Sequence, residues 1–64
     1  MTVKELVLLS LENLDSFEID LGATTKKLNN SFYETIADFE IELYYLSIDK
    51  ETKQPVIVMN LVDY

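Results

Sequence analysis

The last third of the chain holds two β-type segments separated by a charged turn, and this pattern constrains the fold more than any other. Residues 39–48 and 56–62 are rich in aromatic and β-branched side chains, whereas residues 49–55 between them are polar apart from one proline. Two β segments joined by a short polar turn are typical of an antiparallel hairpin. Pro55 stands where the second segment begins, a position at which the missing backbone donor does least harm. We therefore expect a C-terminal hairpin.

Side chains of the first hairpin segment alternate between two faces of the expected sheet. One face takes Phe39, Ile41, Leu43 and Tyr45, and the other takes Glu40, Glu42, Tyr44, Leu46 and Ile48. The second face changes from acidic to apolar along its length. Both faces should therefore be partly covered near the end of this segment.

Residues 2–14 have the spacing of an amphipathic helix. Thr2 and Glu5 predict a capping box at its start, in which each side chain satisfies a free backbone N–H of the other residue. Apolar residues then recur every three or four positions. The predicted face comprises Val3, Leu6, Val7, Leu11 and Leu14, widened by Leu8 and Leu9. Because so short a helix is not stable alone, we expect it to pack on a sheet.

The middle of the chain is less regular. Residues 17–21 alternate strictly between apolar and acidic side chains, which predicts a half-buried strand that ends at Gly22. Residues 23–31 are polar and rich in turn formers, so we expect a loop. Residues 32–36 leave two alternatives open. Ser31 and Glu34 could form a second capping box, but aromatic and β-branched side chains favour a short strand.

Together these segments predict an α+β fold of a single small acidic domain over residues 1–64. The N-terminal helix should pack on a small antiparallel sheet of three to four strands, in the order α-β-β-β-β, with the hairpin at the C-terminal end. Leu, Ile, Val and Phe make up 23 of the 64 residues, which is enough for a core. A core of this size supplies only about 3–5 kcal/mol of stability, so a partner or a second copy would help the fold.

Composition excludes several classes of function. The chain has no cysteine and no histidine, so we expect no metal site, no cofactor and no Cys–His or Ser–His–Asp catalysis. A single glycine excludes a Gly-rich phosphate loop. Twelve acids against five lysines give a net charge of −7, which disfavours direct binding of nucleic acid. We therefore expect a protein that is not an enzyme.

The sequence also predicts a cytoplasmic protein with no membrane contact. The apolar run at residues 6–9 is too short for a signal peptide or a membrane span, and an acid lies among the first five residues. The absence of cysteine is compatible with a reducing compartment.

The acids suggest one candidate binding surface. Side chains two apart on a strand share a face, so carboxylates from two neighbouring strands could cluster. The candidate residues are Glu18, Asp20, Asp38, Glu40 and Glu42. Such a cluster could hold a hard cation, supply a carboxylate pair for glycoside hydrolysis or imitate nucleic-acid phosphates, and its ordinary role is a solvated face that keeps the domain soluble.

Tyrosines suggest a second candidate surface, because tyrosine is enriched at protein interfaces. The set is Tyr33, Tyr44, Tyr45 and Tyr64, of which Tyr44 is the partner-binding candidate. Tyr44 and Tyr45 are adjacent, so they face opposite sides of a strand and at least one should be partly exposed. We expect Lys26 and Lys27 to lie on a mobile loop. Asp49 and Glu51 lack the spacing of an EF-hand and are interpreted as ordinary turn residues.

Residues 1–6 and the leucine-rich helix, followed by residues 17–20, resemble the opening of many small accessory proteins of phages and mobile elements in low-GC Gram-positive bacteria. Residues 32–36, and residues 48–51 running into residues 56–58, are similar to the rest of that type. The resemblance implies a helix packed on a small antiparallel sheet, in a bacterial host cell, and it supplies no catalytic residues.

The leading hypothesis is a non-enzymatic protein-binding module of phage or mobile-element origin, whose partner is another protein. In one version it inhibits a basic, nucleic-acid-binding host protein by imitating DNA charge, with salt-sensitive association. The alternative is a structural homo-oligomer that assembles through the apolar C-terminal strand, residues 56–62.

Overall fold

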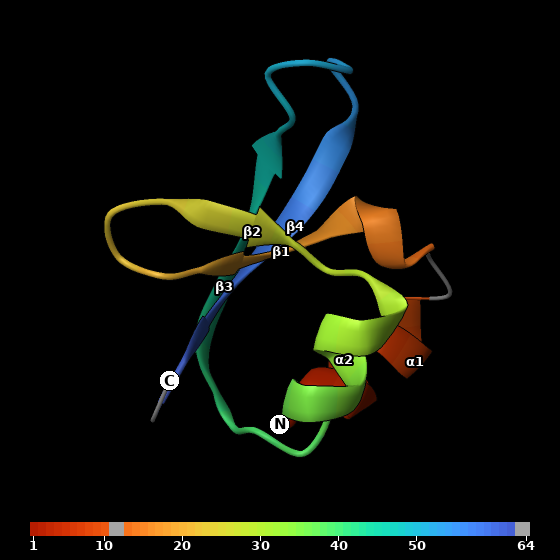
Figure 1. Ribbon diagram of the computed structural model, residues 1–64, viewed down its shortest axis with the longest axis vertical. Helices are drawn as coiled ribbons and strands as arrows, with labels where there is room; N and C mark the ends of the chain where they lie inside the picture. The colour runs from red at the N-terminus through yellow and green to blue at the C-terminus, as the bar shows by residue number, and fades with distance from the viewer. Residues whose placement is uncertain (11–12, 63–64) are drawn as a thin grey trace.

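The computed structural model describes residues 1–10 and 13–62, and Figure 1 shows their arrangement. The elements are α1 (Val3–Ser10), the short 3-10 helix η1 (Leu14–Ser16), β1 (Phe17–Asp20), β2 (Thr25–Lys27), α2 (Asn30–Ile36), β3 (Ile41–Ile48) and β4 (Pro55–Leu61). The described residues thus form an α+β fold that begins with a helix, as the sequence predicts.

The four strands form one sheet in the order β2-β1-β4-β3. β2 is antiparallel to β1, and β3 is antiparallel to β4, but β1 and β4 run parallel. The expectation of a purely antiparallel sheet is therefore wrong in this one pairing. Parallel pairing needs a long crossover, and here the crossover consists of β2, α2 and β3.

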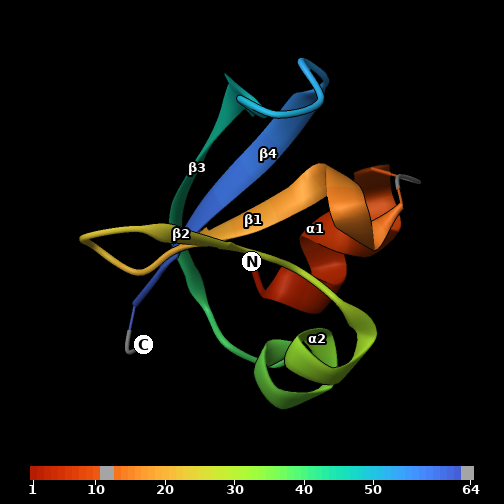
Figure 2. The same ribbon diagram turned by 45° about the horizontal axis from the view of Figure 1, so that its top comes forward.

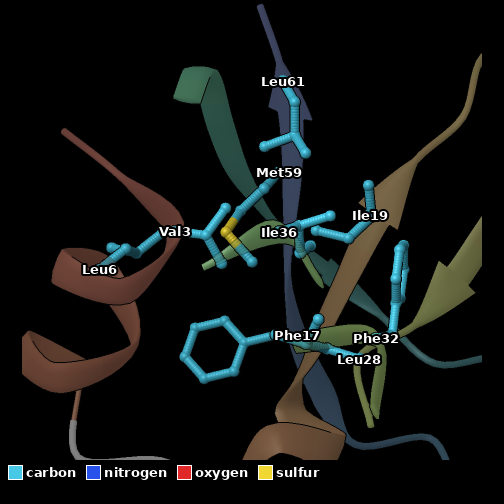
Figure 3. Packing of buried hydrophobic residues seen from close by; sticks show 9 residues of the cluster. All are labelled: Val3, Leu6, Phe17, Ile19, Leu28, Phe32, Ile36, Met59 and Leu61. Atoms are coloured by element: carbon cyan, nitrogen blue, oxygen red, sulfur yellow. The ribbon is translucent and has the colours of Figure 1, made fainter. Parts of the chain in front are cut away.

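Both helices cover the same face of the sheet (Figure 2). This face, called the helix-side face below, contributes Phe17 and Ile19 from β1 and Met59 and Leu61 from β4. Figure 3 shows these side chains meeting Val3 and Leu6 of α1 and the side chains of α2. The fully buried core residues are Val3, Phe17, Ile19, Leu28, Ile36 and Met59.

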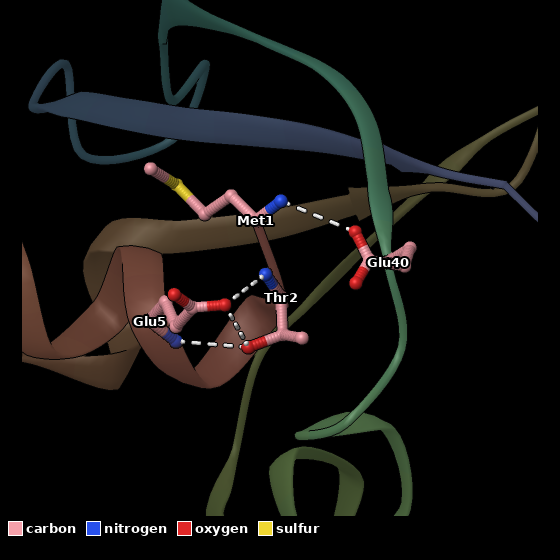
Figure 4. A network of polar contacts seen from close by, with 4 residues as sticks. All are labelled: Met1, Thr2, Glu5 and Glu40. Atoms are coloured by element: carbon pink, nitrogen blue, oxygen red, sulfur yellow. Dashed lines mark hydrogen bonds and ion pairs between the residues drawn. The ribbon is translucent and has the colours of Figure 1, made fainter.

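Helix α1 begins with the predicted capping box. The Thr2 N–H donates to Glu5 Oε1 at 3.0 Å, and the Glu5 N–H donates to Thr2 Oγ1 at 3.2 Å (Figure 4). The Thr2 N–H and the Thr2 hydroxyl, which lies 3.2 Å from the same Oε1, both donate to the Glu5 carboxylate and lower its pKa, with the larger effect from the N–H. The last described residue of the helix is Ser10, whose hydroxyl donates to the Leu6 carbonyl. The predicted range of residues 2–14 is therefore too long, because residues 14–16 form η1.

The predicted apolar face of this helix is confirmed only in part. Val3 and Leu6 are buried, and Val7 and Leu14 pack against the core. The prediction that Leu8 and Leu9 widen this face is wrong, because both are exposed (62% and 70%). The predicted position of Leu11 lies outside the described residues.

Residues 32–36 belong to a helix, so the prediction of a strand is wrong there. The Asn29 side chain caps α2 by accepting from the Phe32 N–H at 2.8 Å, an arrangement typical of an N-cap. Phe32 and Ile36, four residues apart, are both buried. Ser31 lies inside the helix, so the Ser31–Glu34 capping box is not the cap that is used. Tertiary burial at helical spacing outweighs the β propensity of these residues.

The predicted loop over residues 23–31 contains β2 and the start of α2. All three residues of β2 are exposed, so no apolar alternation marks the strand. A tight turn joins it to β1: Gly22 has φ +95°, and its N–H donates to Asp20 Oδ1 at 2.8 Å. The Lys26 ammonium lies 4.7 Å from the centre of the Phe32 ring, which attaches β2 to α2. Lys26 and Lys27 therefore sit on a strand rather than on a loop.

The C-terminal hairpin is confirmed, with Ile48 opposite Pro55 at its end. The predicted two faces of β3 are wrong beyond Ile41, because the register shifts between Ile41 and Leu43. This β-bulge inserts one residue and reverses the alternation that follows it. Ile41 packs on the core side, and Tyr44, opposite the buried Met59, lies on that same side of the sheet.

Replacing Met59 with alanine should destabilise the fold strongly, whereas the same change at Leu46 should not. Met59 is fully buried, and truncation of a buried Met side chain costs about 2–5 kcal/mol. Leu46 is 73% exposed, so its truncation should change the free energy of unfolding by less than about 0.5 kcal/mol. Urea unfolding at low protein concentration measures both values. Equal losses would contradict the position of Met59 in the core.

Candidate protein-binding edge of the sheet

Strand β3 forms one edge of the sheet, because it pairs with β4 alone among the named strands. The other edge is β2. An edge strand carries backbone N–H and C=O groups that point away from the sheet and can pair with another strand. The two edges differ in length and in side chains, since β2 has three residues and β3 has eight.

The hydrogen-bond pattern determines which residues of β3 direct their backbone groups outward. The Asp49 N–H donates to the Gln54 carbonyl at 2.9 Å, in the same register that pairs Ile48 with Pro55. Hydrogen-bonded and non-hydrogen-bonded pairs alternate along an antiparallel ladder. Tyr45 and Ser47 are therefore bonded to β4. Tyr44, Leu46 and Ile48 occupy the non-bonded positions, and their N–H and C=O groups point to the open edge.

The N-terminal residues cover the outer side of the chain where strand β3 begins. The Ile41 N–H donates to the Met1 carbonyl at 2.8 Å, and the Val3 N–H donates to the Phe39 carbonyl at 3.0 Å. Thr2 and Glu40 form an antiparallel bridge between these two bonds. The Met1 amino group also lies 3.1 Å from Glu40 Oε2 (Figure 4). The open stretch of the edge therefore starts after Ile41.

Residues 43–48 carry exposed apolar side chains and no charge. Within this stretch Leu43 is 51% exposed, Tyr44 54%, Tyr45 44%, Leu46 73% and Ile48 64%. The hairpin projects beyond the two helices, so no helix covers its far half (Figure 1). A long, uncharged, apolar edge is a site at which other strands add readily. We call residues 43–48 the β3 edge.

The acidic candidates lie on different parts of the sheet. Glu18 and Asp20 are on β1, and β4 lies between that strand and β3. Glu18 is paired in register with Lys27 of β2, and Asp20 accepts from Gly22 in the β1–β2 turn. Within the described residues, no group of three or more acids, histidines or cysteines could hold a metal ion. The acids of β1 and the acids near the start of β3 therefore do not form one carboxylate cluster.

The other candidate residues lie around the start of β3. Asp38 is exposed between α2 and β3, and Glu40 is engaged with the Met1 amino group. Glu42 is exposed at the bulge, next to the first residue of the β3 edge. Tyr44, the aromatic candidate, lies within that edge. Tyr33 packs against the core, and Tyr64 lies outside the described residues.

Besides the contact between Met1 and Glu40, sequence reasoning missed an ion pair between Lys27 of β2 and Asp49, the residue after β3. Lys27 Nζ lies 3.0 Å from Asp49 Oδ2, and the Asp49 side chain is only 7% exposed. Asp49 Oδ1 also accepts from the Glu51 N–H at 2.8 Å and the Thr52 N–H at 3.3 Å. Asp49 is therefore the organising residue of the hairpin turn rather than an ordinary member of it.

This ion pair shifts the pKa of both partners. The Lys27 ammonium lowers the pKa of the Asp49 carboxyl, and the two turn N–H groups lower it further. The Asp49 carboxylate in turn raises the pKa of Lys27, with smaller contributions from Glu51 and Glu18. The contact joins β2 to the hairpin turn and so fixes the far end of the β3 edge relative to the sheet.

A hollow of about 500 Å³ lies on the sheet face opposite the helices, beside this ion pair. Val58 belongs to its lining, together with residues from both edge strands and from the hairpin turn. These other lining residues include Thr25, Lys27, Tyr45, Ser47, Asp49 and Glu51. The lining carries both positive and negative side chains. Lys27 and Asp49, the two lining residues whose pKa values are shifted, already pair with each other.

The chain matches no family model, no curated protein and no solved structure in the comparisons made. None of the helices in the described residues is long and apolar enough to cross a membrane. The candidate site therefore rests on the geometry of β3 and on its chemistry.

Asp49→Asn should reduce the acid sensitivity of the fold. The folded-state pKa of Asp49 lies below its unfolded value of about 3.9, so its stabilisation is present above that pH and is lost as the pH falls through the folded-state pKa. The asparagine Oδ1 can still accept the turn N–H groups but carries no charge for Lys27. We expect the variant to be less stable than the wild type at neutral pH, with a difference that narrows below about pH 4.

Urea midpoints measured from neutral to acidic pH test this expectation. Asp15→Asn is a matched control, because Asp15 is an exposed acid of η1 that lies outside the Lys27–Asp49 contact. A stability difference between wild type and Asp49→Asn that stays constant down to acidic pH would contradict a role for the charge.

Proposed function

We propose that this chain is a non-enzymatic protein-binding module that takes up an extended segment of a partner protein as an added strand along the β3 edge. The observation that carries the proposal is the outward direction of the backbone groups of Tyr44, Leu46 and Ile48 in a charge-free stretch. Strand addition of this kind obtains affinity from main-chain hydrogen bonds and specificity from alternate side chains.

Side chains beside the edge support recognition of an apolar segment. Tyr44, Leu46 and Ile48 lie on the helix-side face of the sheet, and Leu43 and Tyr45 lie on the opposite face. An added strand would place its own alternate side chains against each of these rows. Exposed tyrosine and large aliphatic side chains supply the contact area that such recognition needs.

The charge around the edge supports a partner segment with a basic residue beside Glu42. Glu42 precedes the β3 edge, Lys50 and Glu51 follow it in the hairpin turn, and the whole chain carries a net charge of −7. Electrostatic attraction would speed association with a basic segment and make it sensitive to salt. A partner segment with an apolar centre and a lysine or arginine at the end that faces Glu42 fits this surface best.

A DNA-mimic version of the proposal has less support. Imitation of nucleic-acid phosphates needs carboxylates spaced over one surface, but β4 separates Glu18 and Asp20 from the acids near β3. Glu40 is also engaged with an amino group. The phage or mobile-element origin and the bacterial host belong to the proposal through the sequence resemblance alone, and the cytoplasmic location through the short apolar run at residues 6–9 and the absence of cysteine.

Leu46→Pro should abolish strand addition while leaving the pairing of β3 with β4 in place. The Leu46 N–H points outward, so proline removes a donor that a partner strand needs but none that β4 uses. The matched variant Leu46→Ala keeps that donor and loses only side-chain contacts. We expect peptides selected on the wild-type protein from a random display library to bind Leu46→Pro at least about tenfold more weakly than Leu46→Ala.

Fluorescence anisotropy with the selected peptides gives the dissociation constants, and circular dichroism shows that each variant is folded. The selected sequences should be apolar at their centres, carry a basic residue at the end that faces Glu42 and bind more weakly at high salt. Peptides that bind Leu46→Pro as tightly as the wild type would show that recognition does not use the backbone of β3.

A further inference from the structure

We propose that, without a partner, the β3 edge is closed by a second copy of this chain, in antiparallel pairing about a two-fold axis at Leu46. The inference rests on the same open edge as the proposed function and names a second occupant for it. In the resulting dimer the two sheets would join edge to edge through their β3 strands. A two-fold arrangement is self-complementary, so each contact on one copy is repeated on the other.

The direction of the backbone groups restricts the possible registers. Only Tyr44, Leu46 and Ile48 present outward N–H and C=O groups in the open stretch, so these residues must pair with one another. With the axis at Leu46, each Leu46 faces its copy, and each Tyr44 faces Ile48 of the second copy. All three positions then form hydrogen-bonded pairs, and all six side chains form one apolar row on the helix-side face.

Charge at the two ends of the edge favours this register over its neighbours. Counted along the chain, the axis at Leu46 brings Glu42 next to Lys50, which lies in the hairpin turn two residues beyond the end of β3 in the second copy, and it does so twice. An axis at Tyr45 would bring Lys50 opposite Glu40, where the edge is already taken by residues 1–3. An axis at Ser47 would bring Lys50 opposite Tyr44 and leave Glu42 without a cation. Opposite charges facing each other across strands are stabilising, and like charges are destabilising.

Two features make this dimer weak. The pairing involves one strand of each copy, so the buried area lies at the small end of specific interfaces. Each copy also carries a charge of −7, and the two copies repel each other. We expect a dissociation constant of about 100 µM that falls as salt screens the repulsion. A basic partner segment has the opposite salt dependence, so salt separates the two occupants of the edge.

Exchange of the two end charges tests the register. Glu42→Lys makes both facing pairs lysine–lysine, and Lys50→Glu makes both facing pairs glutamate–glutamate. Each variant alone should dimerise about tenfold more weakly than the wild type. An equimolar mixture of the two variants should regain the wild-type affinity as a heterodimer, because every facing pair is then of opposite sign.

Net charge alone predicts a different result. Glu42→Lys replaces one negative charge with one positive charge and changes the net charge from −7 to −5, which reduces the general repulsion. If overall charge controlled association, this variant would dimerise more tightly than the wild type. The double variant Glu42→Lys, Lys50→Glu keeps the net charge of −7 and should dimerise like the wild type.

Sedimentation equilibrium over a range of concentrations gives the association constants, and circular dichroism confirms folding. A wild-type protein that stays monomeric at about 1 mM and high salt would overturn the dimer. A dimer that the Glu42→Lys variant strengthens, or that mixing of the two single variants does not restore, would overturn the register.

Amide exchange measured by NMR locates the contact independently of charge. The N–H groups of Tyr44, Leu46 and Ile48 should become protected as the concentration rises, while those of Tyr45 and Ser47 are protected by β4 at every concentration. Dimerisation without this alternating change would place the contact elsewhere. If the protein does not dimerise, the test of peptide binding at the β3 edge is unaffected, because the selected peptides are measured on the monomer.

Discussion

The parallel pairing of β1 with β4 is the constraint on which the rest of the structure depends. It places Phe17 beside Ile57 and Ile19 beside Met59, and so brings the first strand of the chain and the last into the centre of the sheet. β4 then has a hydrogen-bonded neighbour on both sides. The near-continuous apolar sequence of residues 56–62 follows from this central position, because Val56 and Val58 are buried on one face and Met59 and Leu61 on the other. The same pairing closes β4 to any further strand. Edge-to-edge pairing of the C-terminal strand itself would need an edge that β1 and β3 already occupy, and the open edge of the hairpin belongs to β3.

With β1 and β4 in the centre, the two edges of the sheet are β2 and β3, and they are protected very differently. β2 has three residues, all exposed and polar, with two lysines. Its short length and its lysines are the features by which soluble proteins keep edge strands from pairing with other chains. β3 has eight residues, and its far half has no charge, no proline and several exposed apolar side chains. A small domain that protects one edge and leaves the longer one open has a surface suited to strand addition.

The sequence predicts the parts of this fold whose patterns are local. The Thr2–Glu5 capping box, the strand that begins at Phe17 and the hairpin around Pro55 depend on residues close together in the chain, and all three are confirmed. The errors arise where distant residues decide. The β propensity of residues 32–36 gives way because Phe32 and Ile36 reach the core only at helical spacing. Thr25 and the two lysines after it show no strand pattern, since an exposed edge strand needs no apolar alternation. Lys27 and Asp49 lie 22 positions apart in the sequence, and only the curved sheet brings them to 3.0 Å. For the site, the predicted residues Tyr44 and Glu42 lie in or beside the β3 edge, but the sequence pattern predicts partial burial for Leu46 and Ile48, which are exposed.

The β-bulge between Ile41 and Leu43 connects the fold to the candidate site. Before the bulge, Ile41 directs its N–H outward to the Met1 carbonyl, and the edge is closed there by the chain itself. Had the strand continued without an extra residue, the odd-numbered positions would direct their backbone groups outward. The bulge transfers this role to Tyr44, Leu46 and Ile48, and it also turns these side chains toward the face that carries the helices. Since the helices end short of the hairpin turn, that row is left uncovered. One inserted residue therefore sets both the start of the open edge and the side chains that an added strand would meet.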